Sequence, residues 1–292
     1  MQTDTNYYYK ATGSAPLGGK LIAYGVGLVL STVLSIAYIF LVNIMLIPYI
    51  LIFIAILYAV VLGYSAKIVA KIGLRRNKKE RLLFGLYMGV IAYYVQWVVY
   101  IAYLIHGFTG TLQLSVLMDV FLNPADLIHT IGIVNQEGAW SIGDAVVNGW
   151  PLTIIWIFEA GLVLGIPPLI INFHPLPPYS ENLNKWYRKY VLQQFFEYIV
   201  TQNGFIEQLR EKGGQALHDL DKGMPNRFGR ASIFFLSDEE VAYLSFENVF
   251  LENSGRGSEK STSIVHLFKI DKTTAQELME KYRTKKSFFL DY

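Results

Sequence analysis

Two polar side chains lie within long apolar stretches, and their type and position suggest chemistry inside a membrane. Gln96 lies in the uncharged stretch 82–105, and Glu159 is the only charged residue between 145 and 173. An isolated carboxylate in hydrocarbon is costly, so we expect Glu159 to face protein. At 1.5 Å per residue, both side chains lie roughly 12–15 Å below the same membrane surface. The pair predicts a structural interhelical hydrogen bond or a proton- or ion-coupled site, unless another helix register turns Glu159 towards lipid.

Aromatic residues share one face of the helix that carries Gln96. They are Tyr93, Trp97, Tyr100 and Tyr103, which follow helical spacing around Gln96. Such a face is typical of packing combined with an interfacial aromatic belt, and it can also line a polar pocket. The candidate intramembrane polar residues are therefore Glu159, Gln96, Tyr93 and Tyr100.

No other group of residues predicts catalysis, a metal site or a cofactor. Asp126 and His129 are three residues apart on one helix face, but no third metal ligand follows at a fixed spacing. The segment His218 to Asp221 is interpreted as a polar turn. The loop 255–261 lacks the glycine that precedes the lysine of a phosphate-binding loop, and it joins two predicted strands. The chain has no cysteine. We expect no metal and no cofactor, and we favour a protein that is not an enzyme.

The elements that must position Gln96 and Glu159 are transmembrane helices. The 292 residues are 53% hydrophobic and only 16% charged, and the charged residues are unevenly distributed. About 20 apolar residues are enough to span a bilayer. We predict spans near 20–42, 48–70, 83–105 and 151–172. The predicted fold class is a four-transmembrane-helix bundle followed by a cytoplasmic α+β domain.

The basic residues predict the orientation of the bundle. The loop between spans two and three is basic at Lys67, Lys71, Arg75, Arg76, Lys78, Lys79 and Arg81, against Glu80 alone. Basic loops stay in the cytoplasm, whereas residues 82–184 contain no Lys or Arg. We therefore predict an inner-membrane protein with both termini cytoplasmic, including an N-terminal tail, 1–19. The predicted contacts with lipid headgroups are Lys71, Arg75, Arg76, Lys78, Lys79 and Arg81.

Small residues four apart recur in every span and predict close helix packing or an oligomer. They are Gly27, Ser31 and Ser35; Ala55, Ala59 and Gly63; Gly85 and Gly89; and Gly161 and Gly165. The connection 106–150 is predicted to lie outside. It is rich in Leu, Ile and Val, and Asn123-Pro124 is typical of a helix start. Short amphipathic helices on the outer membrane surface are expected there.

The region 173–292 is predicted to form the α+β domain. We expect a helix over 183–213, strands near 231–237, 241–251 and 262–270, and a helix near 273–284 with Asp271 or Thr273 as its cap. Its basic and acidic residues balance, 16 of each. That balance argues against nucleic acid as a partner.

Part of the chain resembles a group of four-span bacterial membrane proteins that has no assigned activity. The resemblance rests on Asn123-Pro124-Ala125-Asp126-Leu127, Glu137-Gly138-Ala139-Trp140, Gly149-Trp150, Trp156 and Glu159-Ala160. It implies a four-span topology and a membrane location, and it implies no chemistry. Ser180 and Leu183 occupy the positions where relatives can carry a C-x-x-C pair, so the resemblance implies that this chain has no metal knuckle there.

Three functions are consistent with these observations. The first is a membrane-anchored interaction or regulatory protein whose cytoplasmic domain binds an unknown protein partner. The second is a small oligomeric transporter or channel that uses Glu159 and Gln96. The third, a membrane enzyme acting on lipid, would need acids and histidines near one interface, and only the outer connection approaches that composition.

Overall fold

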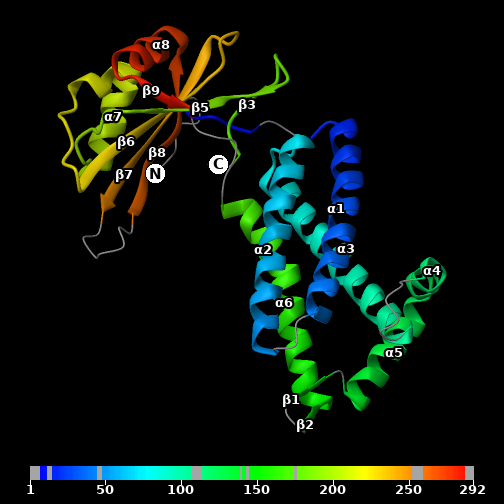
Figure 1. The fold of residues 1–292 in the computed structure, drawn as a ribbon. Coiled ribbons are helices and arrows are strands. Elements are labelled where there is room, and N and C mark those ends of the chain that lie inside the picture. Colours follow the sequence, from blue (N-terminus) through cyan, green and yellow to red (C-terminus); the bar gives the residue numbers. More distant parts are fainter. Residues whose placement is uncertain are drawn as a thin grey trace. The chain divides into compact units, whose positions relative to one another are not determined.

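The computed structural model describes residues 7–11, 15–44, 48–106, 113–138, 140–142, 145–173, 176–251 and 259–286. The chain divides into two units, one formed by residues 13–175 and the other by residues 1–12 together with 176–292. We call their described parts the helix bundle and the sheet domain (Figure 1).

The helix bundle contains four helices that are long and apolar enough to cross a membrane. They are α1 (Leu17–Ile44), α2 (Pro48–Ile72), α3 (Lys78–His106) and α6 (Gly149–Phe173). The structure thus confirms the four apolar helices that the sequence predicts, each within a few residues of its expected ends. The helices α1 and α6 each pack against both α2 and α3, so they lie opposite each other in the bundle.

Glycines set how closely the bundle helices approach one another. A Cβ at Gly85 would lie 2.7 Å from the Cα of Pro168, and one at Gly89 would lie 2.7 Å from the carbonyl oxygen of Val163. The backbones of α3 and α6 are therefore in contact, as small residues allow. Among the described residues, no atom lies within 4 Å of a Cβ added at Gly161 or Gly165 of α6, so this pair does not contact the other described helices of the bundle.

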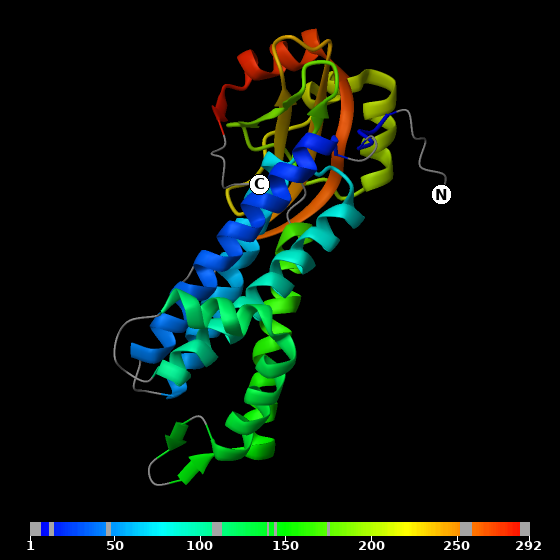
Figure 2. The same cartoon turned by 90° about the vertical axis from the view of Figure 1, so that its right-hand side faces the viewer.

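The segment between α3 and α6 forms two short helices and a hairpin. The helices α4 (Leu114–Leu122) and α5 (Pro124–Glu137) are bent by 100° where they meet. Both pack against α3, along its side, and not across the end of the bundle. The short strands β1 (Trp140–Ile142) and β2 (Ala145–Val147) pair beside the first turn of α6 (Figure 2).

The sheet domain is built on five antiparallel strands in the order β8-β7-β6-β5-β9. Their bounds are β5 Arg188–Leu192, β6 Arg227–Phe235, β7 Val241–Leu251, β8 Glu259–Asp271 and β9 Thr284–Lys286. The helices α7 (Gln202–Lys212), η1 (Gly213–Asp219) and α8 (Lys272–Lys281) share one hydrophobic core with one face of this sheet. Its largest fully buried side chains are Phe196, Phe246 and Phe268.

The sequence-based helix over 183–213 is wrong for its first part. Residues 185–192 form β4 (Lys185–Trp186) and β5, and the helix begins only at Gln202. At Tyr190 and Val191, β5 pairs with β6 on one side and with β9 on the other. Aromatic and β-branched residues suit such a central strand. The three predicted strands and the last helix are present, and Asp271 is the cap of α8.

An N-terminal segment completes the sheet domain. The amide of Tyr9 donates to the carbonyl of Leu267 at 3.0 Å, and the amide of Lys269 donates to the carbonyl of Tyr7 at 2.7 Å. Tyr8 forms the antiparallel bridge to Phe268. The predicted N-terminal tail therefore includes a short strand that covers part of the free edge of β8.

Candidate functional site: a polar cluster inside the helix bundle

Hydroxyl groups hold α1 against α3. The Oγ of Ser31 donates to the carbonyl of Met88 at 3.2 Å, and the Oγ of Ser35 lies 2.9 Å from the carbonyl of Ala92. The Oγ of Ser35 also lies 2.8 Å from the phenolic oxygen of Tyr58 on α2. The spacing that predicts close packing of Ser31 and Ser35 thus also provides hydrogen bonds between helices.

Glu159 is the centre of the polar interior. The phenolic hydroxyl of Tyr38 donates to Glu159 Oε1 at 2.5 Å, and Gln96 Nε2 donates to the same oxygen at 3.1 Å. The ring of Tyr38 stacks on that of Tyr58, with centroids 4.4 Å apart. All four bundle helices contribute to this arrangement, which we call the polar cluster: Ser35, Tyr38, Tyr58, Gln96 and Glu159.

The polar cluster joins two helices that face each other across the bundle, α1 and α6. Because α1 and α6 lie opposite each other, the side chain of Tyr38 must cross the bundle interior to reach Glu159. The contact between Gln96 and Glu159 predicted from depth is present. Tyr38 and Tyr58 also contribute and were not predicted, although both carry hydroxyl groups within uncharged stretches.

One acceptor of the cluster has no hydrogen bond. Gln96 is 3% exposed, and its Oε1 has no partner among the residues that the structure describes. A buried carbonyl oxygen without a donor costs free energy. The side-chain oxygen of Gln96 can therefore accept a hydrogen bond from a donor that enters the polar cluster.

The tyrosines predicted beside Gln96 serve mainly in packing. The ring of Trp97 lies edge-on to Tyr93, Tyr100 and Trp156, with centroids 6.3, 5.8 and 4.9 Å apart. Tyr93 and Tyr100 are half-buried against the core. This aromatic group connects α3 with α6, and the hydrogen bonds of Glu159 within the described part of the bundle come from Tyr38 and Gln96, not from Tyr93 or Tyr100.

The basic residues between α2 and α3 do not share one environment. Lys78 and Lys79 are exposed, whereas Arg75 and Arg81 are buried. The guanidinium carbon of Arg75 lies 4.4 Å from the ring centroid of Tyr24 and 4.5 Å from that of Phe84, which is a double cation–π contact. Arg75 thus holds the turn between α2 and α3 against α1, a role apart from contact with headgroups.

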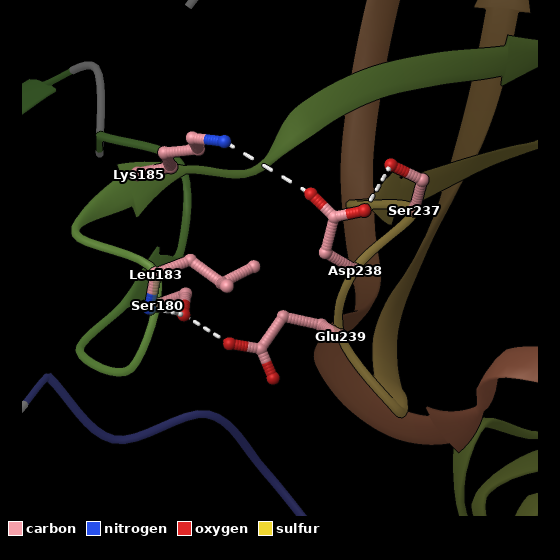
Figure 3. Close-up of polar contacts among 6 residues, drawn as sticks. All are labelled: Ser180, Leu183, Lys185, Ser237, Asp238 and Glu239. Atoms are coloured by element: carbon pink, nitrogen blue, oxygen red, sulfur yellow. Dashed lines mark hydrogen bonds and ion pairs between the residues drawn. The ribbon is translucent and has the colours of Figure 1, made fainter.

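A short hairpin in the sheet domain contains Ser180 and Leu183. The strands β3 (Tyr179–Ser180) and β4 pair there, and the amide of Leu183 donates to Ser180 Oγ at 3.0 Å (Figure 3). Ser180 also hydrogen-bonds Glu239. The described residues contain no group of three or more His, Cys, Asp or Glu side chains that could hold a metal ion.

His218 lies against the last turn of α8. Its Nδ1 is 2.7 Å from the hydroxyl of Tyr282 and 2.9 Å from Lys281 Nζ. Burial and the neighbouring ammonium of Lys281 lower the pKa of His218. The neutral ring therefore fastens η1 to α8, and Asp219 pairs with Lys212 at 2.6 Å instead. This arrangement is structural.

Comparison with protein-family models, with curated proteins and with solved structures gives no significant match to this chain.

Proposed function

We propose that this protein is a multi-pass inner-membrane protein whose sheet domain is cytoplasmic and binds a protein partner. The four apolar helices support insertion into a membrane. An even number of crossings returns both ends of the chain to the same side. The pairing of Tyr7–Tyr9 with β8 supports this topology independently, because a strand and its partner must share a compartment.

The basic residues between α2 and α3 support a cytoplasmic location for that side. The acid among them, Glu80, forms an ion pair with Lys20 of α1 at 2.9 Å. Lys78 and Lys79 are exposed there and can meet anionic headgroups.

Exposed apolar side chains at one end of the sheet carry the proposal of a protein partner. They surround the place where β6 begins and β7 ends: Phe195, Val200, Met224 and Phe250, which are 44, 83, 69 and 43% exposed. The carbonyl of Phe195 accepts from the amide of Gly223, and Phe250 is paired with Arg227, so these residues belong to one region. Grouped apolar exposure on a water-facing domain marks an interaction surface.

Site-specific cross-linking of the full chain tests this proposal, because the chain contains no cysteine. Met224→Cys and Phe250→Cys, each carrying a photoreactive maleimide, are expected to give the same protein adduct in membranes. Gln208→Cys on the exposed side of α7 is the matched control and should give none. Adducts only with lipid, or identical adducts from all three positions, would exclude a protein-binding surface at this end.

The polar cluster supports a second candidate, a small proton- or ion-coupled transporter. The observation that favours it is the buried Gln96 Oε1 beside Glu159, because this carbonyl can accept a hydrogen bond from a protonated carboxyl. Glu159→Gln keeps the shape and removes the charge. If purified Glu159→Gln protein folds normally and its proton and cation fluxes in vesicles equal those of the unchanged protein, this candidate fails.

A further inference from the structure

The bend between α4 and α5 exposes polar side chains that belong to neither the polar cluster nor the sheet domain. Asp119, Asn123, Asp126 and His129 are all exposed there. Asn123 Nδ2 donates to the backbone oxygen of Asp119 at 2.8 Å and to its Oδ1 at 3.1 Å. Among the described residues, none forms a hydrogen bond or ion pair with the carboxylate of Asp126 or the ring of His129.

The bend lies beside the middle of the long helices. The hydroxyl of Tyr94 on α3 donates to the carbonyl of Phe121 at 2.6 Å, next to the bend. Tyr94 is 12 residues before His106, the last residue of α3. This separation corresponds to about 18 Å along the helix.

A second estimate of the depth comes from α6, which packs against α3. Val120 and Leu127, on either side of the bend, share a hydrophobic cluster with Trp97, whose ring contacts Trp156 of α6. Trp156 is seven residues after Gly149, the first residue of α6, which corresponds to about 10 Å. The end of α5 lies beside the first residue of α6, because Asn135 Nδ2 donates to the carbonyl of Gly149 at 3.1 Å.

Two exposed carboxylates at this depth are incompatible with a surrounding of lipid chains. Charged side chains within the hydrocarbon region face protein or water and take polar partners. On the membrane surface, where the sequence predicts these helices, Asp119 and Asp126 would lie in water; the contact between Tyr94 and Phe121 instead places the bend beside the middle of α3.

We propose that two copies of the chain associate in the membrane through the bend between α4 and α5. The proposal rests on membrane insertion of the bundle and does not depend on the partner of the sheet domain. A twofold interface places the same surface of both copies in contact. His129 is the only side chain of α4 and α5 that can carry a positive charge, since residues 82–184 contain no Lys or Arg.

In a twofold pair, His129 of each copy can therefore meet Asp119 or Asp126 of the other copy, which gives two equivalent contacts. The bend is complementary to itself in charge, with acids and a histidine on one exposed face. Met118, Leu122 and Ile128 are exposed around it, at 47, 66 and 70%, and supply apolar contact area at the rim. Water filling the bend, or a different membrane protein covering it, are the other possible occupants, and the experiment separates them.

Disulfide cross-linking in native membranes tests the proposal, because each introduced cysteine is the only one in the chain. Ala125→Cys and Ile128→Cys, oxidised with copper phenanthroline, are expected to give disulfide-linked dimers. Ile154→Cys, on an exposed face of α6, is the matched control. Asp126→Asn should lower the dimer yield of Ala125→Cys about ten-fold. The exchange Asp126→His with His129→Asp should restore it.

Three results would overturn the dimer, and they are distinguishable from a failure of membrane insertion. If neither cysteine in the bend gives more dimer than Ile154→Cys, the bend does not meet a second copy. If Ala125→Cys reacts with a membrane-impermeant maleimide as fast as a cysteine in an exposed loop, the bend faces water. If a bifunctional reagent at Ala125→Cys captures only a different protein, the occupant is not a second copy. Release of the protein by alkaline carbonate would instead refute insertion itself.

Discussion

The helix bundle and the sheet domain are held together in opposite ways. In the bundle, backbones approach where side chains are missing, at Gly85 and Gly89, and polar groups meet in the interior around Glu159. In the sheet domain, large rings such as Phe196 and Phe246 fill the interior. In a bilayer, where we propose that the bundle lies, hydrocarbon gives helices no hydrophobic reason to associate, so close contacts and hydrogen bonds must hold them together. In water, burial of apolar area suffices.

Removal of a core ring from the sheet domain should have the largest effect and leave the bundle intact. Phe246 is fully buried, and an added Cβ at Gly229 would lie 2.1 Å from its ring. Phe246→Ala is expected to lower the free energy of unfolding of this domain by about 3–5 kcal/mol. Hydrogen exchange should rise across β6, β7 and β8 and remain unchanged in α1 and α3. Faster exchange in both units would show that they unfold together.

A bulky residue between backbones should damage the bundle and spare the sheet domain. Gly89→Leu is expected to separate α3 from α6, because the carbonyl of Val163 cannot move aside as a side chain can. The expected loss is about 3 kcal/mol, measured as a lower melting temperature in detergent. Gly161→Leu is the control, since an added Cβ there meets no atom within 4 Å. Equal effects of both substitutions would contradict the packing of α3 on α6.

Loss of one hydroxyl should weaken the polar cluster more modestly. Tyr38→Phe removes the hydrogen bond to Glu159 Oε1 and retains the stacked ring on Tyr58. We expect a cost of about 1–2 kcal/mol in bundle stability. Glu159→Ala combined with Tyr38→Phe should cost less than the two single changes added together, because each single change removes the same hydrogen bond. Strict additivity in this double-mutant cycle would show that the two side chains do not interact.

The smallest expected effect lies at the start of α8 and depends on pH. Asp271 accepts from the amide of Thr274 at 2.7 Å and from the hydroxyl of Thr273 at 2.5 Å, and these hydrogen bonds lower the pKa of its carboxyl. Asp271→Ala should cost about 1 kcal/mol at neutral pH. The stabilisation from the lowered pKa is complete above the unfolded value, about 3.9, and is lost as the pH falls through the folded value.

Denaturation of the unchanged protein, of Asp271→Ala and of Asp271→Asn at several pH values measures their free energies of unfolding. The difference in free energy of unfolding between the unchanged protein and Asp271→Ala should narrow towards acid, whereas the difference between Asp271→Asn, which keeps an acceptor without a charge, and Asp271→Ala should not. A difference that widens below pH 4 would contradict the role of the ionised cap.

The two regions also differ in how well the sequence predicts them. The bundle helices follow from uncharged stretches long enough to span a bilayer, and the strand 241–251 has the bounds of β7. The helix predicted over 183–213 failed because its apolar residues fit either period, and the pairing with β6 and β9 decided the outcome. That pairing joins segments far apart in sequence, which local patterns do not report.

The polar cluster was only half predictable for a related reason. Depth alone brings Gln96 and Glu159 to one level, and the structure joins them. The contribution of Tyr38 requires knowing that α1 lies opposite α6, and a tyrosine near a helix end is as typical of the membrane interface as of an interior hydrogen bond. Similarly, the sequence places Arg75 in a basic loop, whereas the aromatic rings that it contacts, Tyr24 and Phe84, belong to α1 and α3.

The short strand Tyr7–Tyr9 gives the synthesis of this protein a definite order. Its partner, the segment Leu267–Lys269 of β8, leaves the ribosome only after the four bundle helices have been made. Until then Tyr7–Tyr9 has no partner strand, and once β8 has formed, its edge stays open to pairing with other chains until this segment binds it. A contact that spans nearly the whole sequence also forms slowly. The segment Tyr7–Tyr9 therefore joins the sheet late, and we expect a change in this segment to impair the assembly of the C-terminal sheet first.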